Sequence, residues 1–458
     1  MKEIVYHGLG YVGLTGAVHF ARAGINVIGY DPDQSVVDAV NAGRPKAGEF
    51  LEYIAGLQTR PNTVQALINA GLLRATTNFD EIIDKPIHII AVPTEKNGEP
   101  YDEIVLATLD RLHDVGVEGA TVLIESTLQP GTIDRWLARL AERSGIALGR
   151  ASKYGLVDLH VAVCPRRDWF ADPKRNLDNL PRVIGGVKPC CTTRASSILS
   201  FVTDAGLHLH TDYRTAEVTK ALENALFHLP IMLCHQLACA MPHVNIAEAV
   251  RLACTHWRFE SFGGLYLGFG PGGRCVPLGP RYLLSAWGQR AGSLGGPDGP
   301  RILRSAMTAE ITLHEAIARA ARRHLGRGEY AGAVVLGIAY RLGFKDAGLS
   351  PGLSVLSELK AHEFVAFSHD PLWTKEEMAA FNNGVHDPYY DDLPALVAHP
   401  DVVLLATPHT EYLDLPPKVE WRSGQVVIDG QGAWKRYREL FADKGVKYVV
   451  VGEPGWTG

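Results

Sequence analysis

Glu3-Ile-Val-Tyr-His-Gly-Leu-Gly-Tyr-Val-Gly13 is the stretch that decides the fold of the first half of this chain. Residues 3–7 are a short apolar run that predicts a β-strand, and the glycine turn after it opens a helical stretch that continues to Ala23. Asn26-Val-Ile-Gly-Tyr30 predicts a second strand, which ends at Asp31. A strand, a helix and a second strand within about 30 residues make a βαβ unit, from which parallel sheets are built.

Further apolar runs predict strands in two separate blocks of the chain. They are residues 88–92, 121–125, 159–163 and 182–184 in the first block, and 331–337, 364–367, 401–406, 426–429 and 447–451 in the second. Between the blocks, residues 216–240 predict one long apolar helix broken by Pro230, followed by helices over 245–253 and about 301–325. The chain is therefore predicted to be α/β, with two Rossmann-like doubly wound parallel sheets joined by a long central helix and a helical region.

Length and composition limit the class of protein. A chain of 458 residues, 46% of them hydrophobic, exceeds one ordinary core, and we predict three domains, residues 1–210, 211–328 and 329–458. The net charge of -5 argues against non-specific binding to nucleic acid or to a membrane surface. No run of about 18 uncharged apolar residues predicts a membrane span. A strand that starts at Glu3 leaves no room for a signal peptide, so a cytoplasmic protein is expected.

The seven cysteines are odd in number and scattered, without a CxxC pair. This pattern is typical of reduced thiols and predicts neither a disulfide framework nor a metal site. Most of them are expected to be buried or structural: Cys234, Cys239 and Cys254 in apolar helical contexts, and Cys190 and Cys191 in a loop.

The first glycine turn predicts a dinucleotide site. Gly8 permits the tight turn, Gly10 lets backbone amides approach a pyrophosphate, and Gly13 allows the helix to pack closely on the strand. Asp31 follows the second strand, where a carboxylate accepts hydrogen bonds from a ribose. Because that carboxylate would repel a 2′-phosphate, the cofactor is predicted to be NAD rather than NADP.

Cys275 differs from the other cysteines because it lies in the glycine-rich run Gly268-Phe-Gly-Pro-Gly-Gly-Arg-Cys-Val-Pro277. Such a turn exposes its thiol, and the adjacent Arg274 favours the nucleophilic thiolate. Lys220 and Asn224 are one helical turn apart, so an ammonium and an amide share a helix face and could stabilise an oxyanion. Without further information, a solvated helix face is the better explanation of this pair.

These motifs, in this order, resemble the nucleotide-sugar 6-dehydrogenases, which oxidise UDP-glucose, UDP-N-acetylhexosamines or GDP-mannose to uronic acids. The resemblance covers nearly the whole chain. It rests on Gly8–Leu14, Ala91-Val-Pro-Thr94, Glu125-Ser-Thr-Leu-Gln-Pro-Gly-Thr132, Pro181–Gly186, Ala216–Lys220 through Asn224, the Cys275 loop, and Gly337-Ile-Ala-Tyr340 with Ser350-Pro351. Cys164-Pro-Arg-Arg-Asp168 with Asn179, and His256-Trp-Arg258, look closer to the UDP-N-acetylhexosamine branch.

The resemblance implies a role for each motif. Cys275 would attack the C6 aldehyde, Lys220 and Asn224 would stabilise the oxyanion, and Thr127 would help to place water. NAD would be held in the first domain by Gly8, Gly10, Tyr11, Val12, Gly13, Asp31, Pro93, Thr94, Ser126 and Thr127. The UDP-sugar would be held chiefly by the C-terminal domain, and the residues implied in binding it are Arg166, Lys220, Asn224, Arg258, Gly272 and Arg341. A homodimer built on the apolar face of residues 221–240 is also implied, with Arg258 reaching across the subunit interface.

The chain departs from the family pattern at three positions. Arg166 stands where a glutamate base is usual, Gly279 where an aspartate is usual, and Gly348 where an arginine is usual. Asp168 and Glu125 are possible substitutes for the missing base. Two alternatives therefore stay open beside the four-electron oxidation. One is a two-electron oxidation that stops at the aldehyde or uses an unusual nucleotide-linked substrate, and the other is a non-catalytic paralogue that binds NAD and nucleotide sugar.

Overall fold

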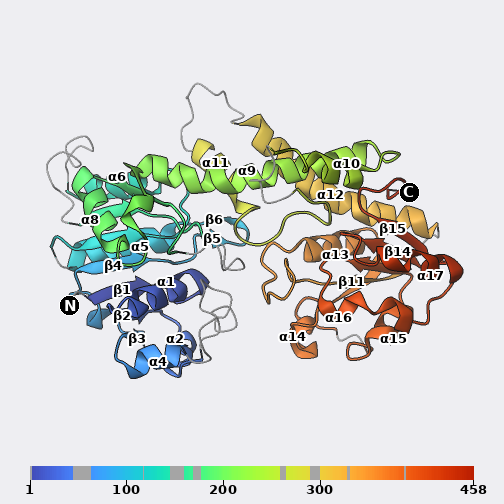
Figure 1. Ribbon diagram of the computed structural model, residues 1–458, viewed down its shortest axis with the longest axis horizontal. Coiled ribbons are helices and arrows are strands. Elements are labelled where there is room, and N and C mark those ends of the chain that lie inside the picture. The colour runs from blue at the N-terminus through green and yellow to red at the C-terminus, as the bar shows by residue number, and fades with distance from the viewer. Residues whose placement is uncertain are drawn as a thin grey trace. The chain divides into compact units, whose positions relative to one another are not determined.

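A computed structural model describes residues 3–44, 63–116, 118–144, 159–168, 177–257, 265–288, 300–326, 331–385 and 388–457. The chain divides into two compact units, each with its own sheet (Figure 1). Unit 1 comprises Met1–Leu222 and Ser285–Arg290, and unit 2 comprises Glu223–Leu284 and Ala291–Gly458. Among the described helices, none combines the length and the apolar character that crossing a membrane requires.

Unit 1 contains an eight-stranded sheet in the order β10-β9-β8-β7-β4-β1-β2-β3. The strands are β1 (Glu3–His7), β2 (Asn26–Tyr30), β3 (Leu73–Thr76), β4 (Ile87–Ile90), β7 (Thr121–Ile124), β8 (His160–Val163), β9 (Arg182–Gly186) and β10 (His208–Asp212). The predicted α/β sheet is confirmed, but it is not parallel throughout, because β8 pairs antiparallel with β9. The two edge strands, β3 and β10, were not predicted from the sequence. Strand β3 has only four residues and β10 shows no apolar alternation, so neither gives a clear local pattern.

The helices of unit 1 cover this sheet and carry its core. They are α1 (Tyr11–Arg22), α2 (Gln34–Asn41), α4 (Thr63–Asn69), α5 (Glu103–Val115), α6 (Thr132–Ser144) and α8 (Pro189–Leu199), with a short hairpin of β5 (Glu95–Lys96) and β6 (Glu99–Pro100). Val5, Ile90 and Val122 of the sheet pack in one cluster with Leu109 and with Trp136, which is fully buried. Cys190 and Cys191 lie in α8 rather than in a loop, because Pro189 begins that helix.

Unit 2 contains a five-stranded parallel sheet in the order β12-β11-β13-β14-β15. Its strands are β11 (Ala331–Leu336), β12 (Phe364–His369), β13 (Val402–Leu405), β14 (Val426–Asp429) and β15 (Lys447–Val450), so all five predicted strands are confirmed. Its helices include α10 (Ile246–Ala253), α11 (Leu278–Gly288), α12 (Arg301–Leu325), α13 (Pro351–Ala361), α14 (Lys375–Ala379), α15 (Leu393–Ala398), α16 (Thr410–Leu413) and α17 (Arg438–Asp443). The strand order reverses between β11 and β13, and ligands of doubly wound sheets bind at such a reversal.

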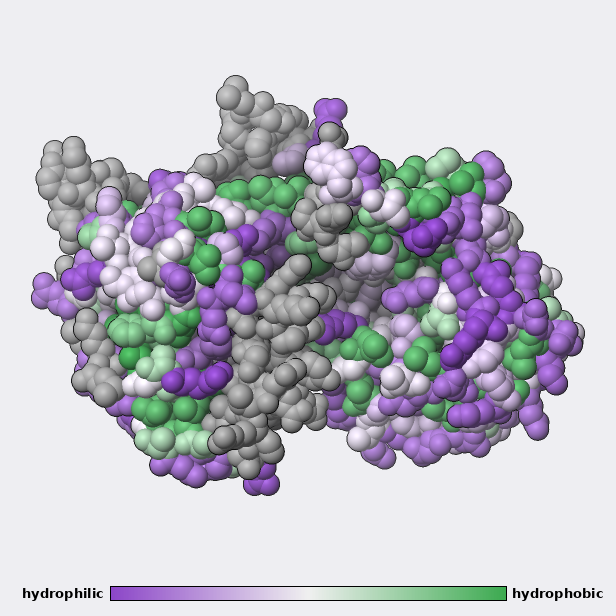
Figure 2. Space-filling model, in the orientation of Figure 1, coloured by the Kyte–Doolittle hydropathy of each residue, from purple (hydrophilic) through white to green (hydrophobic). Residues whose placement is uncertain are grey.

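Helix α9 (Tyr213–Ala240) is a single helix, and the boundary between the units falls within it. The predicted break at Pro230 is wrong. Buried contacts of the residues that follow the proline outweigh the lost backbone hydrogen bond, and these residues are Ile231, Met232 and Cys234. Apolar side chains also lie exposed along α9, in the green band that Figure 2 shows on this helix. They are Val218, Leu222, Leu226, Phe227, Leu233 and Leu237.

Candidate functional site

The glycine turn of unit 1 joins β1 to α1, at the point where the order of the sheet reverses between β1 and β4. A Cβ at Gly8 would lie 2.6 Å from the Ala91 carbonyl oxygen, and one at Gly13 only 1.9 Å from the Gly8 carbonyl oxygen. A Cβ at Gly10 would meet no atom within 4 Å. The first and third glycines are therefore required by packing, while the second leaves open space in front of the first turn of α1. This is the shape that a dinucleotide pyrophosphate needs, and Tyr11 and Val12 begin the helix there.

Asp31 lies directly after β2 and supports the same turn. Its Oδ2 accepts a hydrogen bond from the Leu9 amide at 2.9 Å, and its Oδ1 accepts one from the Asp33 amide at 3.0 Å. The carboxylate is therefore held beside the glycine turn by the backbone. This position fits the ribose-binding role, since a carboxylate oxygen still has capacity for a further donor.

Replacing Asp31 with asparagine is expected to weaken NAD binding and to reduce discrimination against NADP. A lost charge-assisted hydrogen bond of about 1.5–3 kcal/mol corresponds to a KM for NAD raised roughly 10- to 100-fold. Steady-state kinetics with both cofactors measure the effect. Asp33→Asn is the matched control, because Asp33 caps α2 through the Ser35 amide and should leave the ratio of the two cofactors unchanged.

The loops after β4 and β7 are joined by side-chain hydrogen bonds. The Thr94 hydroxyl donates to the Thr127 carbonyl at 2.6 Å, and the Ser126 hydroxyl donates to the Val92 carbonyl at 2.7 Å. Both loops follow the carboxyl ends of adjacent parallel strands, where nucleotide ligands bind. The structure thus brings Pro93, Thr94, Ser126 and Thr127 to the same edge of the sheet as the glycine turn.

Glu217 is a site residue for which the sequence offered no specific signal. It lies on α9 and is 1% exposed, and its carboxylate accepts hydrogen bonds from the Gly131 amide at 2.7 Å and the Ile133 amide at 2.9 Å. Burial raises its pKa to about 7. Glu217 therefore holds the loop that carries Thr127 against α9, on the helix that also carries the half-buried Lys220.

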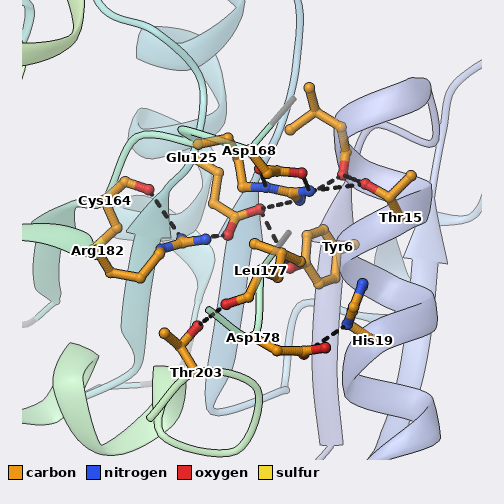
Figure 3. A network of polar contacts seen from close by, with 12 residues as sticks. Tyr6, Thr15, His19, Glu125, Cys164, Asp168, Leu177, Asp178, Arg182 and Thr203 are labelled. Atoms are coloured by element: carbon orange, nitrogen blue, oxygen red, sulfur yellow. Dashed lines mark hydrogen bonds and ion pairs between the residues drawn. The ribbon is translucent and has the colours of Figure 1, made fainter. Parts of the chain in front are cut away.

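A buried ion-pair network lies beneath the first turn of α1 (Figure 3). Arg166 is 6% exposed and makes a bidentate pair with Asp168, with both distances 2.6 Å. It also pairs with Glu125 at 3.3 Å, and Glu125 pairs with Arg182 at 2.7 Å. Although burial raises the pKa of Asp168, the charge of Arg166 outweighs burial and lowers it to about 2.

Arg166 also ties this network to the cofactor helix. Its guanidinium donates to the Val12 carbonyl at 3.0 Å and to the Thr15 hydroxyl at 3.0 Å. Together with the bonds to Asp168 and Glu125, these contacts use all five of its N–H donors. The geometry favours a positioning role for Arg166 over contact with a substrate. It likewise places Asp168 and Glu125 in ion pairs, which does not favour either as a water-activating base.

In unit 2, the glycine-rich loop before Cys275 packs directly on the turn after β11. A Cβ at Gly272 would lie 2.6 Å from Pro351 Cδ and 2.7 Å from Tyr340 Cβ, and one at Gly273 only 2.8 Å from the Tyr340 ring. The Gly273 amide also donates to the Gly348 carbonyl at 3.0 Å. The Cys275 thiol is exposed at the end of this loop. The turn carries Arg341, whose guanidinium lies 5.7 Å from the centre of the Phe344 ring.

Two buried histidines fix the other end of the Cys275 loop. His235 of α9 donates from Nδ1 to the Ile231 carbonyl at 2.8 Å, so its Nε2 accepts the Gly268 amide at 3.1 Å. Burial lowers its pKa to about 4, which keeps the ring neutral near pH 7. His314 of α12 contacts the Phe269 carbonyl through Nε2 at 3.0 Å. Neither histidine was predicted, because a lone histidine in an apolar helix is usually a satisfied core residue.

Gly279 lies in the first turn of α11, against α9. A Cβ at this position would lie 2.6 Å from both Asn224 Cβ and the Ala225 amide nitrogen. Only glycine fits at position 279, because α11 packs directly on the backbone of α9 at Asn224. Asn224 is 6% exposed. Of the remaining predicted residues, Arg258 lies outside the described part of the chain.

Comparison with known proteins agrees with this geometry. The models of the UDP-glucose/GDP-mannose dehydrogenase family match three successive segments, the NAD-binding domain at residues 2–202, the central domain at 214–296 and the UDP-binding domain at 334–436. A UDP-N-acetyl-D-mannosamine dehydrogenase of Pyrococcus horikoshii is 29% identical over 97% of this chain and 99% of its own. An NDP-N-acetyl-D-galactosaminuronic acid dehydrogenase of Ralstonia nicotianae is 26% identical over 95% and 97%.

The structural comparison gives the same result. The solved UDP-D-ManNAc dehydrogenase from Pyrococcus horikoshii superposes with a TM-score of 0.78 at 26% identity, over 99% of this chain and 100% of that one. The segment that carries the glycine turn is matched by the NAD-binding domain and the C-terminal segment by the UDP-binding domain, so the cofactor is NAD and the chain is a nucleotide-sugar dehydrogenase that uses a UDP-sugar. The chain belongs to the UDP-glucose/GDP-mannose dehydrogenase family.

Proposed function

We propose that this chain oxidises C6 of a UDP-N-acetylhexosamine, of the UDP-N-acetyl-D-mannosamine kind, to the uronic acid. The relatives named above support the N-acetylhexosamine substrate. The observation that carries the proposal is the packing of the Cys275 loop on the turn after β11, because the matched UDP-binding domain contains that turn. A UDP-sugar bound at this turn would have an exposed thiol close by.

Each residue of the proposed site has one task. Two molecules of NAD, bound one after the other, would each accept one hydride from C6. After the C6 alcohol has lost a hydride and a proton, the Cys275 sulfur forms a bond to the aldehyde carbon, and Lys220 and Asn224 stabilise the oxygen that gains negative charge. Loss of a second hydride from C6 leaves a thioester on Cys275. Water, placed by Thr127, then breaks the carbon–sulfur bond and releases the acid and the free thiol.

A second candidate outcome, oxidation only as far as the aldehyde, has two observations in its favour. All five donors of Arg166 are occupied within the protein, and Gly279 has no room for a side chain. Neither position therefore supplies a base for thioester hydrolysis. Loss of a positioned base costs about 10²–10⁴ in rate.

Counting NADH per product molecule separates the two outcomes. We expect two NADH and the uronic acid from UDP-N-acetyl-D-mannosamine, with UDP-glucose and UDP-N-acetylglucosamine as comparisons. Acid-quenched protein should carry the UDP-sugar mass on the Cys275 peptide, and Cys275→Ala should carry none. One NADH with an aldehyde product supports the second outcome, and no NADH from any of the three sugars contradicts the proposal.

The chain is further proposed to act as a homodimer that covers the exposed apolar side chains of α9. Six large apolar side chains are exposed on this one helix, in a protein that is 46% hydrophobic. Such a group of exposed apolar side chains is typical of a subunit contact. Sedimentation velocity measures the state directly, and a monomer at micromolar concentration would contradict the dimer.

A further inference from the structure

We propose a zinc site in unit 1, formed by His160, Cys190 and Cys191. His160 is the first residue of β8, and the two cysteines are the second and third residues of α8. The sulfurs of Cys190 and Cys191 each lie 3.7 Å from Nδ1 of His160, and the three ligand atoms all lie within 4.8 Å of one another. Among the residues that the structure describes, no other group of histidine, cysteine and acidic side chains converges in this way.

Hydrogen bonding to His160 does not account for the approach of both sulfurs to Nδ1. Nδ1 of an imidazole carries either one N–H or one lone pair, so it can form a good hydrogen bond with one sulfur and not with two. A cation at the lone pair would instead bind all three atoms. With Zn–S of about 2.3 Å and Zn–N of about 2.0–2.1 Å, tetrahedral coordination places sulfur and nitrogen roughly 3.6 Å apart. Both observed distances between sulfur and Nδ1, 3.7 Å, match this expected separation.

The charges and exposure of the cluster also suit a thiophilic dication. Two thiolates would neutralise the charge of Zn²⁺, and both cysteines lie in the first turn of α8. Cys191 is buried, His160 is half-buried and Cys190 is exposed, so water can reach a fourth coordination position. Three protein ligands with one open position are a common zinc arrangement.

The position of the cluster separates it from the dehydrogenase reaction. His160 pairs with Thr121, the first residue of β7, whereas Ser126 and Thr127 follow the last residue of that strand. The cluster therefore lies at the opposite ends of the strands from the cofactor turn. Along the strands, the two are separated by about four residues, or about 13 Å. Zinc there would join α8 to β8 and would not take part in hydride transfer.

Cobalt binding to the full-length, chelator-treated and reduced protein tests the site. We expect one equivalent of Co²⁺ to give thiolate-to-metal charge-transfer bands and tetrahedral d–d bands, and Zn²⁺ to displace it. Cys190→Ser, His160→Gln and Cys191→Ala should each weaken binding at least about tenfold. Cys190 is exposed, so its replacement cannot act by unfolding the core.

Two other thiols provide the controls. Cys254→Ser and Cys275→Ser should leave the bands unchanged, because neither residue belongs to the cluster. Bands that persist in Cys190→Ser and His160→Gln, or that disappear in Cys275→Ser, would overturn the proposal. A protein that shows no thiolate charge transfer with Co²⁺ would overturn it as well.

Discussion

Replacing Gly279 with aspartate, the residue usual at this position in the family, is expected to destabilise unit 2 and to abolish most turnover. A Cβ at 279 would lie 2.6 Å from the Ala225 amide nitrogen and 2.8 Å from the Asn224 carbonyl carbon, and a helix backbone cannot move away cheaply. Overpacking costs about 1–3 kcal/mol, and an unpaired buried carboxylate adds to it. We therefore expect the free energy of unfolding to fall by at least about 3 kcal/mol.

The rate of NADH formation should fall with it, because any shift of α11 displaces Asn224. NAD affinity should stay the same, since the glycine turn of unit 1 contains none of these contacts. Gly279→Ala separates the steric effect from the charge. Gly332→Ala is the matched control in the same unit, since the nearest atom to its Cβ would lie at 3.4 Å, an ordinary contact. A Gly279→Asp protein that is as stable and active as the wild type would show that the α9–α11 contact is wrong.

Replacing Arg166 with methionine is expected to cost about 3–5 kcal/mol of folding free energy, because it leaves the buried Asp168 carboxylate without its bidentate partner and leaves Glu125 with Arg182 alone. Asp168 and Glu125 would then face each other in a site where their side chains are 4% and 1% exposed. Chemical denaturation at pH 7 measures the loss. The KM for NAD should rise as well, because Val12 and Thr15 lose the guanidinium that holds the first turn of α1.

The folding free energy lost in Arg166→Met should be largest near neutral pH and smaller in acid. In the wild type the pKa of Asp168 is lowered from 3.8 to about 2, so its contribution to stability is full above about 4 and is lost as the pH falls towards 2. Without Arg166, the charge that outweighs burial is gone and only the weaker influence of Arg182 and of the backbone remains, so the pKa of Asp168 should rise; the penalty is then largest near neutral pH and shrinks in acid. Lysine at position 166 keeps the charge but has only three N–H donors. The stability of Arg166→Lys should therefore lie between those of the wild type and Arg166→Met. Equal stability of wild type and Arg166→Met across this range would contradict the network.

The roles of individual departures from the family pattern could not be predicted from sequence. Arg166 was expected to bind substrate, yet its donors are used by residues as far apart in the chain as Val12 and Asp168. At position 279 the sequence showed only that the aspartate usual in the family is replaced by glycine. The contact of Gly279 with Asn224 depends on the packing of α11 against α9. Such roles depend on which distant segments meet, and no local pattern encodes that.

Local sequence patterns were sufficient to predict the two α/β sheets, the glycine turn with Asp31, and the exposed cysteine in its glycine loop. These features follow from hydrophobic alternation and from backbone conformations that glycine alone permits, and both act over a few neighbouring residues. Three other features depend on packing between distant segments: the continuity of α9 through Pro230, the two edge strands, and the approach of His160 to Cys190 and Cys191, which lie 30 and 31 residues further along the chain. Burial and long-range contacts set each of these, because the free energy of packing exceeds the local preference of the chain.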